Sequence, residues 1–209
     1  MKNRGFTLIE MLVSVAIFTI VMVVALGALL SLSEADRKAQ TINAAVNNLS
    51  FAVDSMSRLI RTGLDYDCGA SDNTVTPIQR DCINTPMSSI AFQVVDNSLN
   101  GCVLNSACSV VYKLDVSQDP NISLCGQKIL PYGCIERKIC ANNFCGAFAP
   151  ITSPEVTVLS LSFYVIGETS GDNVQPKVTI LVSGTAPVTA TKSTAFNLQT
   201  SVTARLYGL

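Results

Sequence analysis

The chain has 209 residues, which is enough for one domain with an appendage and for a sizeable buried core. Only 14% of the residues are charged and 48% are hydrophobic, against about 25% charged in an average soluble domain, so part of the apolar surface must lie outside a globular core. The absence of histidine excludes Ser-His-Asp triads, Cys-His dyads and histidine metal sites, and a net charge of −1 without a basic run excludes nucleic acid as an expected partner.

The first element is an apolar run from Phe6 to Ser33, which follows the opening Met-Lys-Asn-Arg-Gly and contains Glu10 as its only charge. A bilayer core needs about 20 apolar residues in a helix, so the run is long enough to span one. It is too long for the apolar region of a secretory signal peptide, although Ala25-Leu26-Gly27 would serve as a cleavage site. A lone carboxylate in a membrane is costly, so Glu10 disfavours both a signal peptide and a plain anchor.

The contiguous sequence Gly5-Phe6-Thr7-Leu8-Ile9-Glu10, with Lys2 and Arg4 before it and an apolar helix after it, resembles the type III leader of type IV pilins and pseudopilins. The resemblance implies that a prepilin peptidase cuts between Gly5 and Phe6 on the cytoplasmic side and methylates the new N-terminus at Phe6. The apolar helix would remain as the assembly stalk. We expect Glu10 to pair, inside a helical bundle, with the amine of a neighbouring Phe6, because a desolvated ion pair is tolerable where a lone ion is not.

One helix is predicted from Phe6 to about Thr62, since Gly27 is the only Gly or Pro inside it. Gly27 costs about 1 kcal/mol of helix propensity relative to Ala, and it is compatible both with helix packing and with local melting on assembly. Residues 6–33 form the transmembrane or filament-core half, after a leader of residues 1–5. Residues 34–62 form an amphipathic half that packs on the following domain, because apolar residues recur there at spacings typical of one helix face. These are Ile42, Val46, Leu49, Val53, Met56 and Ile60.

Residues 63–154 are predicted to be a cysteine-rich loop region with short strands, because proline and turn residues interrupt the segment repeatedly. Ser89–Val95 and Val110–Val116 are expected to form a hairpin, with turn chemistry at Asn100-Gly101 between them. A further short strand is predicted over Ile135–Ile139. In the second hairpin strand the residues expected to share one face are Val110, Tyr112, Leu114 and Val116.

Eight cysteines lie within this region and none outside it, which predicts disulfides and an oxidising compartment. Eight cysteines allow 105 pairings, so connectivity cannot be derived, but local bridges between Cys68 and Cys82 and between Cys102 and Cys108 are the simplest. The remaining candidates are Cys125, Cys134, Cys140 and Cys145. A metal site is the weaker alternative, because no Cys-x-x-Cys spacing and no histidine are present.

Residues 155–209 are predicted to form antiparallel strands. In the first of these strands Leu159, Leu161, Phe163 and Val165 share one face. A second strand over Val178–Val182 follows a turn around Gly171-Asp172-Asn173. In the last strand the residues that share one face are Phe196, Leu198, Val202, Ala204 and Leu206. One long helix covering an antiparallel sheet is an α+β roll, which agrees with the pilin-like fold that the leader resemblance implies.

The resemblance implies a structural function, as a minor pilin or pseudopilin of a type IV pilus or type II secretion pseudopilus. The chain is long for a major subunit and its cysteine insertion is not a family hallmark, which favours a minor one. Adhesion, DNA uptake and secretion are not distinguished by the residues. One alternative is an adhesin-like binding module. The other is an anchored enzyme using Asp65, Asp67 and Asp72, which lack the spacing of a calcium loop and are more typical of turns.

No catalytic site, metal or cofactor is expected. The partners that the resemblance implies are prepilin peptidase, other pilin or pseudopilin subunits contacted by helix packing, the inner-membrane assembly platform, and membrane lipid before assembly. The chain is expected to cross the inner membrane once, with its C-terminal domain outside the cytoplasm, and then to enter the pilus or pseudopilus.

Overall fold

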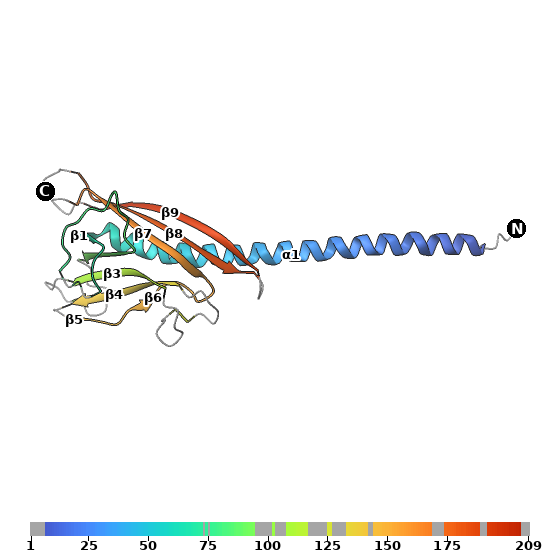
Figure 1. Ribbon diagram of the computed structural model, residues 1–209, viewed down its shortest axis with the longest axis horizontal. Coiled ribbons are helices and arrows are strands. Elements are labelled where there is room, and N and C mark those ends of the chain that lie inside the picture. Colours follow the sequence, from blue (N-terminus) through green and yellow to red (C-terminus); the bar gives the residue numbers. More distant parts are fainter. Residues whose placement is uncertain are drawn as a thin grey trace. The chain divides into compact units, whose positions relative to one another are not determined.

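The structure is a computed structural model in which the chain divides into two compact units, residues 1–41 and 42–209. It describes residues 7–72, 74, 76–94, 102, 108–116, 125–126, 133–141, 144–168, 174–188 and 192–205. One long helix, α1 (Leu8–Arg61), contributes residues to both units, and all the described strands follow it in the chain (Figure 1).

The strands form two antiparallel sheets. The first has six strands in the order β1-β2-β3-β4-β5, with β6 paired to β4, and the second has three in the order β7-β8-β9. The strands of the first sheet are β1 (Gly63–Cys68), β2 (Ser89–Val94), β3 (Cys108–Asp115), β4 (Cys134–Ala141), β5 (Phe144–Cys145) and β6 (Ala149–Pro150). Those of the second sheet are β7 (Thr157–Ile166), β8 (Lys177–Pro187) and β9 (Ser193–Thr203).

In the first unit, α1 is a single helix whose side chains from Leu8 to residue 40 are all exposed. The predicted long helix is therefore confirmed for the described residues, while Phe6 lies outside them. The helix continues through Gly27, where an added Cβ would meet no other atom within 4 Å. A packing role for Gly27 would consequently need another chain.

In the second unit, one stripe of α1 is buried. The predicted stripe is right for Leu49, Met56 and Ile60 but wrong for Val46, which is 41% exposed, while Ala45 is buried at 5%. At its N-terminal end, the buried face of α1 is therefore rotated by one residue relative to the prediction. The small side chain of Ala45 lies in the core in place of the larger side chain of Val46. The full set of buried helix residues is Ala45, Leu49, Ala52, Val53, Met56, Leu59 and Ile60.

A single large core joins this helix stripe to both sheets, which confirms the α+β class. Its largest fully buried side chains are Tyr66, Phe92, Tyr112 and Phe163. The ring centroids of Tyr66 and Phe92 lie 5.6 Å apart, and those of Phe92 and Tyr112 lie 6.1 Å apart. The roll thus contains two sheets around one core where one sheet was expected.

The predicted hairpin is confirmed, since β2 pairs antiparallel with β3, and Ile135–Ile139 lies within β4, the next strand of the sheet. Residues 63–154 hold more sheet than the expected loop region, however. The strand β3 is buried on both faces near its middle, because Val111 packs with Ala70 and Ala91 on the side away from the main core. Val116 lies beyond β3 and is 50% exposed, so the prediction that it shares a strand face with Val110 and Tyr112, which are buried, is wrong. Asn100-Gly101 lies outside the described residues.

The strand β1 was not predicted, because its sequence Gly-Leu-Asp-Tyr-Asp-Cys is poor in β-forming residues. It pairs with β2 through a register shift between Leu64 and Asp67, where Asp65 has a φ of 55°. Gly63 is required at the start, since a Cβ there would lie 2.5 Å from the Phe92 ring. The Tyr66 hydroxyl donates to the Ile60 carbonyl in the last turn of α1 and to the Gly63 carbonyl at 2.8 Å. Tertiary contacts therefore decide this strand.

The second sheet differs from its prediction at one position. A bulge in β7 between Val158 and Ser160 turns Leu159 outward, where it is 46% exposed, and buries Val158 in its place. The other predicted core positions of β7 are buried. In β9, Val202 is buried, as is Ala204 just beyond it, and Phe196 and Leu198 are half-buried. Leu206 and the turn at 171–173 lie outside the described residues.

Candidate functional site

The first turn of α1 is built around two polar side chains. Thr7 precedes the helix, and its backbone N–H donates to Glu10 Oε2 at 3.2 Å. The Thr7 hydroxyl donates to the same oxygen at 3.1 Å, and the Glu10 N–H points back to the Thr7 hydroxyl at 3.3 Å. This reciprocal pattern is a capping box, which satisfies backbone donors that a helix N-terminus leaves open. Gly5 and Phe6 lie outside the described residues.

The capping box was not anticipated, although Thr7-x-x-Glu10 is its sequence signature. In the single chain the Glu10 side chain therefore hydrogen-bonds to the first residue before its own helix. Its negative charge also interacts favourably with the positive end of the helix dipole. Its second carboxylate oxygen, Oε1, makes no hydrogen bond among the described residues, and the side chain is exposed. A carboxylate accepts at both oxygens, so Glu10 can take a further donor without leaving Thr7.

The helix beyond this turn is long and apolar enough to cross a membrane. Its large side chains are exposed along the whole run, with Leu8 at 79% and Leu30 at 71% as examples. The hydroxyls of Ser14 and Thr19 donate to backbone carbonyls of the preceding turn, at 2.7 and 2.8 Å. Because these hydroxyls are satisfied within the helix, they add little cost to an apolar surrounding.

All eight cysteines form disulfides. The structure joins Cys68 to Cys82 and Cys102 to Cys108, the two pairings that sequence spacing made simplest. The four cysteines that spacing left unassigned form two further local bridges. These are Cys125–Cys134 and Cys140–Cys145.

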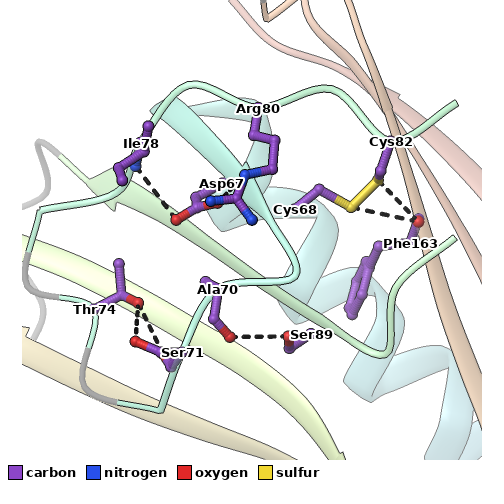
Figure 2. Close-up of polar contacts among 10 residues, drawn as sticks. All are labelled: Asp67, Cys68, Ala70, Ser71, Thr74, Ile78, Arg80, Cys82, Ser89 and Phe163. Carbon is purple, nitrogen blue, oxygen red and sulfur yellow. Dashed lines mark hydrogen bonds and ion pairs between the residues drawn. A yellow bond between two sulfur atoms is a disulfide. The ribbon is translucent and has the colours of Figure 1, made fainter. Parts of the chain in front are cut away.

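The Cys68–Cys82 bridge lies where one connecting segment, residues 76–88, meets both sheets (Figure 2). Arg80 pairs with Asp67 of β1, and Met87 pairs with Phe163 of β7 through bonds of 2.8 and 3.2 Å. Cys82 and Cys68 both direct their sulfur atoms at the Phe163 carbonyl, at 3.3 and 3.7 Å. The segment therefore connects an edge of the first sheet to an edge of the second, and the disulfide fixes it there.

The three aspartates considered as catalytic carboxylates have separate partners. Asp65 accepts from the Gln79 amide at 2.8 Å, and Asp72 forms an ion pair with Lys113 at 2.9 Å. Asp67 is 4% exposed, lies 3.5 Å from the Arg80 guanidinium and accepts from the Ile78 N–H at 3.4 Å. Within the described part of the chain these aspartates form no cluster at metal-ligand distances. Their contacts are those of residues that hold loops and strand ends in place.

Asp115, Cys125 and Cys134 are the described residues that do gather at metal-ligand distances. Cys125 and Cys134 are bonded to each other, so neither offers a thiolate. Asp115 instead lies 3.7 Å from the Cys125 sulfur. The disulfide therefore explains why Cys125 and Cys134 lie close together beside Asp115.

Glu136 of β4 is a buried carboxyl on the side of the first sheet away from the main core. It is 3% exposed, and its Oε1 has no hydrogen-bond partner among the described residues. Burial raises its pKa, and the Asp115 and Asp72 carboxylates raise it further, while Lys113 and Lys138 oppose the rise. The folded protein therefore binds the Glu136 proton more tightly than the unfolded chain does.

We predict that Glu136→Gln makes the protein more stable at neutral pH, by about 1 kcal/mol, because the neutral amide avoids the cost of burying an ionised carboxylate. The raised pKa means that the stability contributed by protonated Glu136 is complete below the ordinary value of 4.5 and is lost as the pH rises through the higher folded value. Urea unfolding in detergent at several pH values, followed by tyrosine fluorescence, measures the difference between variant and wild type. A difference that does not change with pH would contradict this assignment.

Comparison with known proteins found a match at the start of the chain. Residues 1–26 match the family described as "Prokaryotic N-terminal methylation motif", the leader of type IV pilin-like proteins. Searches of curated proteins and of solved structures found no match. The leader implies processing by a peptidase and assembly with other pilins. Together with the apolar helix, it indicates membrane anchoring with the C-terminal part of the chain outside the cytoplasm.

Proposed function

We propose that this chain, whose first 26 residues form a prepilin-type leader and helix, is a minor subunit of a type IV pilus or of a type II secretion pseudopilus. Its work is assembly. Before assembly it is anchored in the inner membrane by residues 6–33, and an assembly platform in that membrane then moves it into the filament, where the same residues form part of the core.

The observation that carries the proposal is the contiguous leader Gly5-Phe6-Thr7-Leu8-Ile9-Glu10, followed by a helix whose side chains are all exposed over residues 8–40. A surface of this kind needs either lipid or other helices around it. The leader accounts for a lipid surrounding first and a helical surrounding later. Removal of residues 1–5 eliminates Lys2 and Arg4 and leaves the apolar helix in the membrane, from which it can enter a filament.

Each residue of the motif has a proposed role. Gly5 sets the cleavage position, and Phe6 becomes the methylated N-terminus. Glu10 fixes the register of the subunit by accepting from the Phe6 amine of a neighbour. The geometry of the capping box supports this last role, because Oε2 is occupied by Thr7 while Oε1 makes no hydrogen bond among the described residues.

Mass spectrometry of the protein isolated from membranes tests the proposal. We expect a mature N-terminus at Phe6 that carries a methyl group. An N-terminus at Met1, or one near Ala28 after cleavage at a secretory site, would refute processing as a prepilin and with it the proposed function.

A further inference from the structure

We propose that the outer edge of β9 is a docking site at which a strand of a neighbouring filament subunit adds to the three-stranded sheet. The inference rests on the proposed function, because it names the part of the C-terminal unit through which the subunit contacts its neighbour. It assigns a site outside the leader and the long helix.

Among the residues that the structure describes, β9 is an open sheet edge, while the other sheet edges are protected. It pairs with β8 along its whole length from Ser193 to Thr203, and no strand pairs with its other side among the described residues. At the opposite side of the same sheet, β7 is covered by the segment 76–88, which bonds to Phe163 and Val165. Open edges expose unpaired backbone N–H and C=O groups, which another extended chain can bind.

In the first sheet, two further features protect the edge strands from pairing with another chain. Its outer strand β1 is irregular near Asp67 and carries the bridge to Arg80, and the strands at its far side, β5 and β6, are two residues each. Bulges, bridges and very short strands are ways in which proteins block edge-to-edge pairing. β9 has none of them, because its 11 residues include no proline and its pairing with β8 has no register shift.

The chemistry of β9 identifies the kind of partner. No residue of β9 is charged, and its exposed side chains are small or neutral polar ones such as Ala195, Asn197, Gln199 and Ser201. Hydroxyl pairs already link the strands of this sheet, at 2.6 Å between Ser160 and Ser183 and at 2.9 Å between Thr179 and Ser201. A further uncharged strand continues the same ladder without bringing like charges together.

The occupant that we assign is the edge strand of a different subunit. Two copies of β9 that pair in antiparallel fashion are related by a two-fold axis perpendicular to the sheet, which reverses one chain relative to the other. Parallel pairing of the same two edges needs a two-fold axis along the strands, which places the buried face of one sheet on the exposed side of the other. Subunits that leave one membrane and enter one filament share their orientation, so a neighbour of this kind cannot present β9 to β9. A strand of another pilin-like subunit can run antiparallel to β9 and pair with its backbone, while the two subunits keep the same orientation in the filament.

Photo-crosslinking in cells that assemble the filament tests the site with the full chain. The row Ser160, Ser183 and Asn197 crosses the three strands in register, so Ser160 on β7 and Asn197 on β9 are matched exposed positions on one face. p-Benzoylphenylalanine at position 197 is expected to form an adduct with a strand peptide of another pilin-like subunit, identified by mass spectrometry. The same probe at position 160 is expected to give several-fold less of that adduct.

A charge test uses the same pair of positions. Asn197→Lys with Gln199→Lys is expected to lower the amount of subunit in sheared filaments several-fold, because lysines on an edge strand disfavour pairing. Ser160→Lys serves as the matched control and is expected to leave incorporation unchanged. Retained disulfides and an unchanged melting temperature check the fold of each variant.

Three results would overturn the inference. Wild-type subunit in filaments without a strand adduct at position 197, or unchanged incorporation of the double lysine variant, would reject the site and leave the proposed function standing. An adduct between two copies of β9 would reject the assigned occupant. Absence of the wild-type subunit from filaments would reject the proposed function and the inference together.

Discussion

Replacement of Glu10 by valine or alanine is expected to abolish incorporation into filaments while leader cleavage and membrane insertion continue. The valine variant leaves the Phe6 amine of the neighbour without its carboxylate in an apolar bundle. Removing one partner of a buried ion pair costs about 3–5 kcal/mol, which lowers the assembly equilibrium constant by roughly two to four orders of magnitude. Immunoblots of sheared filaments and of membranes measure incorporation and insertion, and the mass of the mature chain reports cleavage.

The capping box supplies a control that separates two roles of Glu10. Glutamine can keep the hydrogen bonds that Glu10 makes with Thr7, at 3.1 and 3.2 Å, but it cannot neutralise an amine. We therefore expect Glu10→Gln to fail in assembly as the valine variant does. Normal incorporation of the valine or alanine variant would refute the pairing, and rescue by glutamine alone would assign Glu10 to helix capping instead.

Loss of the Cys68–Cys82 disulfide is expected to have the largest effect on the stability of the C-terminal unit. The bridge closes a loop with a sequence separation of 14, for which chain entropy predicts a loss of about 3 kcal/mol in the double variant Cys68→Ala/Cys82→Ala. Because the bridge also holds the segment 76–88 between the two sheets, the amides of Met87 and Phe163 should exchange faster with solvent. Urea unfolding and hydrogen exchange of the full chain in detergent measure the two effects.

The matched control is the Cys140–Cys145 bridge at the other side of the first sheet. Its sequence separation is 5, so Cys140→Ala/Cys145→Ala should lose about 2 kcal/mol and leave the exchange of Met87 and Phe163 unchanged. Equal exchange at Met87 in both double variants would show that Cys68–Cys82 has no special part in joining the sheets.

The features that the sequence predicted correctly are contiguous in the chain. The leader from Gly5 to Glu10 is six adjacent residues, and the apolar helix is one uninterrupted run, so neither needs knowledge of distant segments. The hairpin of β2 and β3 and the alternation in β9 are likewise local patterns. The capping box was within reach by the same means, because Thr7 and Glu10 have the standard spacing.

The features that were missed depend on which segments meet in space. Val46 fits the apolar spacing of the helix as well as Ala45 does, and only packing against the strands selects Ala45 for the core. The bulge in β7 exposes Leu159, which alternation had placed inside. The strand β1 exists because it pairs with β2 and because Tyr66 fills the core, in spite of two aspartates that disfavour a strand.

The amino-acid sequence by itself therefore determined the leader, the long apolar helix and the expectation that the cysteines form disulfides, because each depends on residue types and spacings that are local in the chain. The tertiary structure decided the division of the strands into two sheets, the disulfide partners of Cys125 and Cys140, and the open edge at β9. These are properties of pairs of segments, and their free energy arises only when strands far apart in the chain bury their apolar faces together.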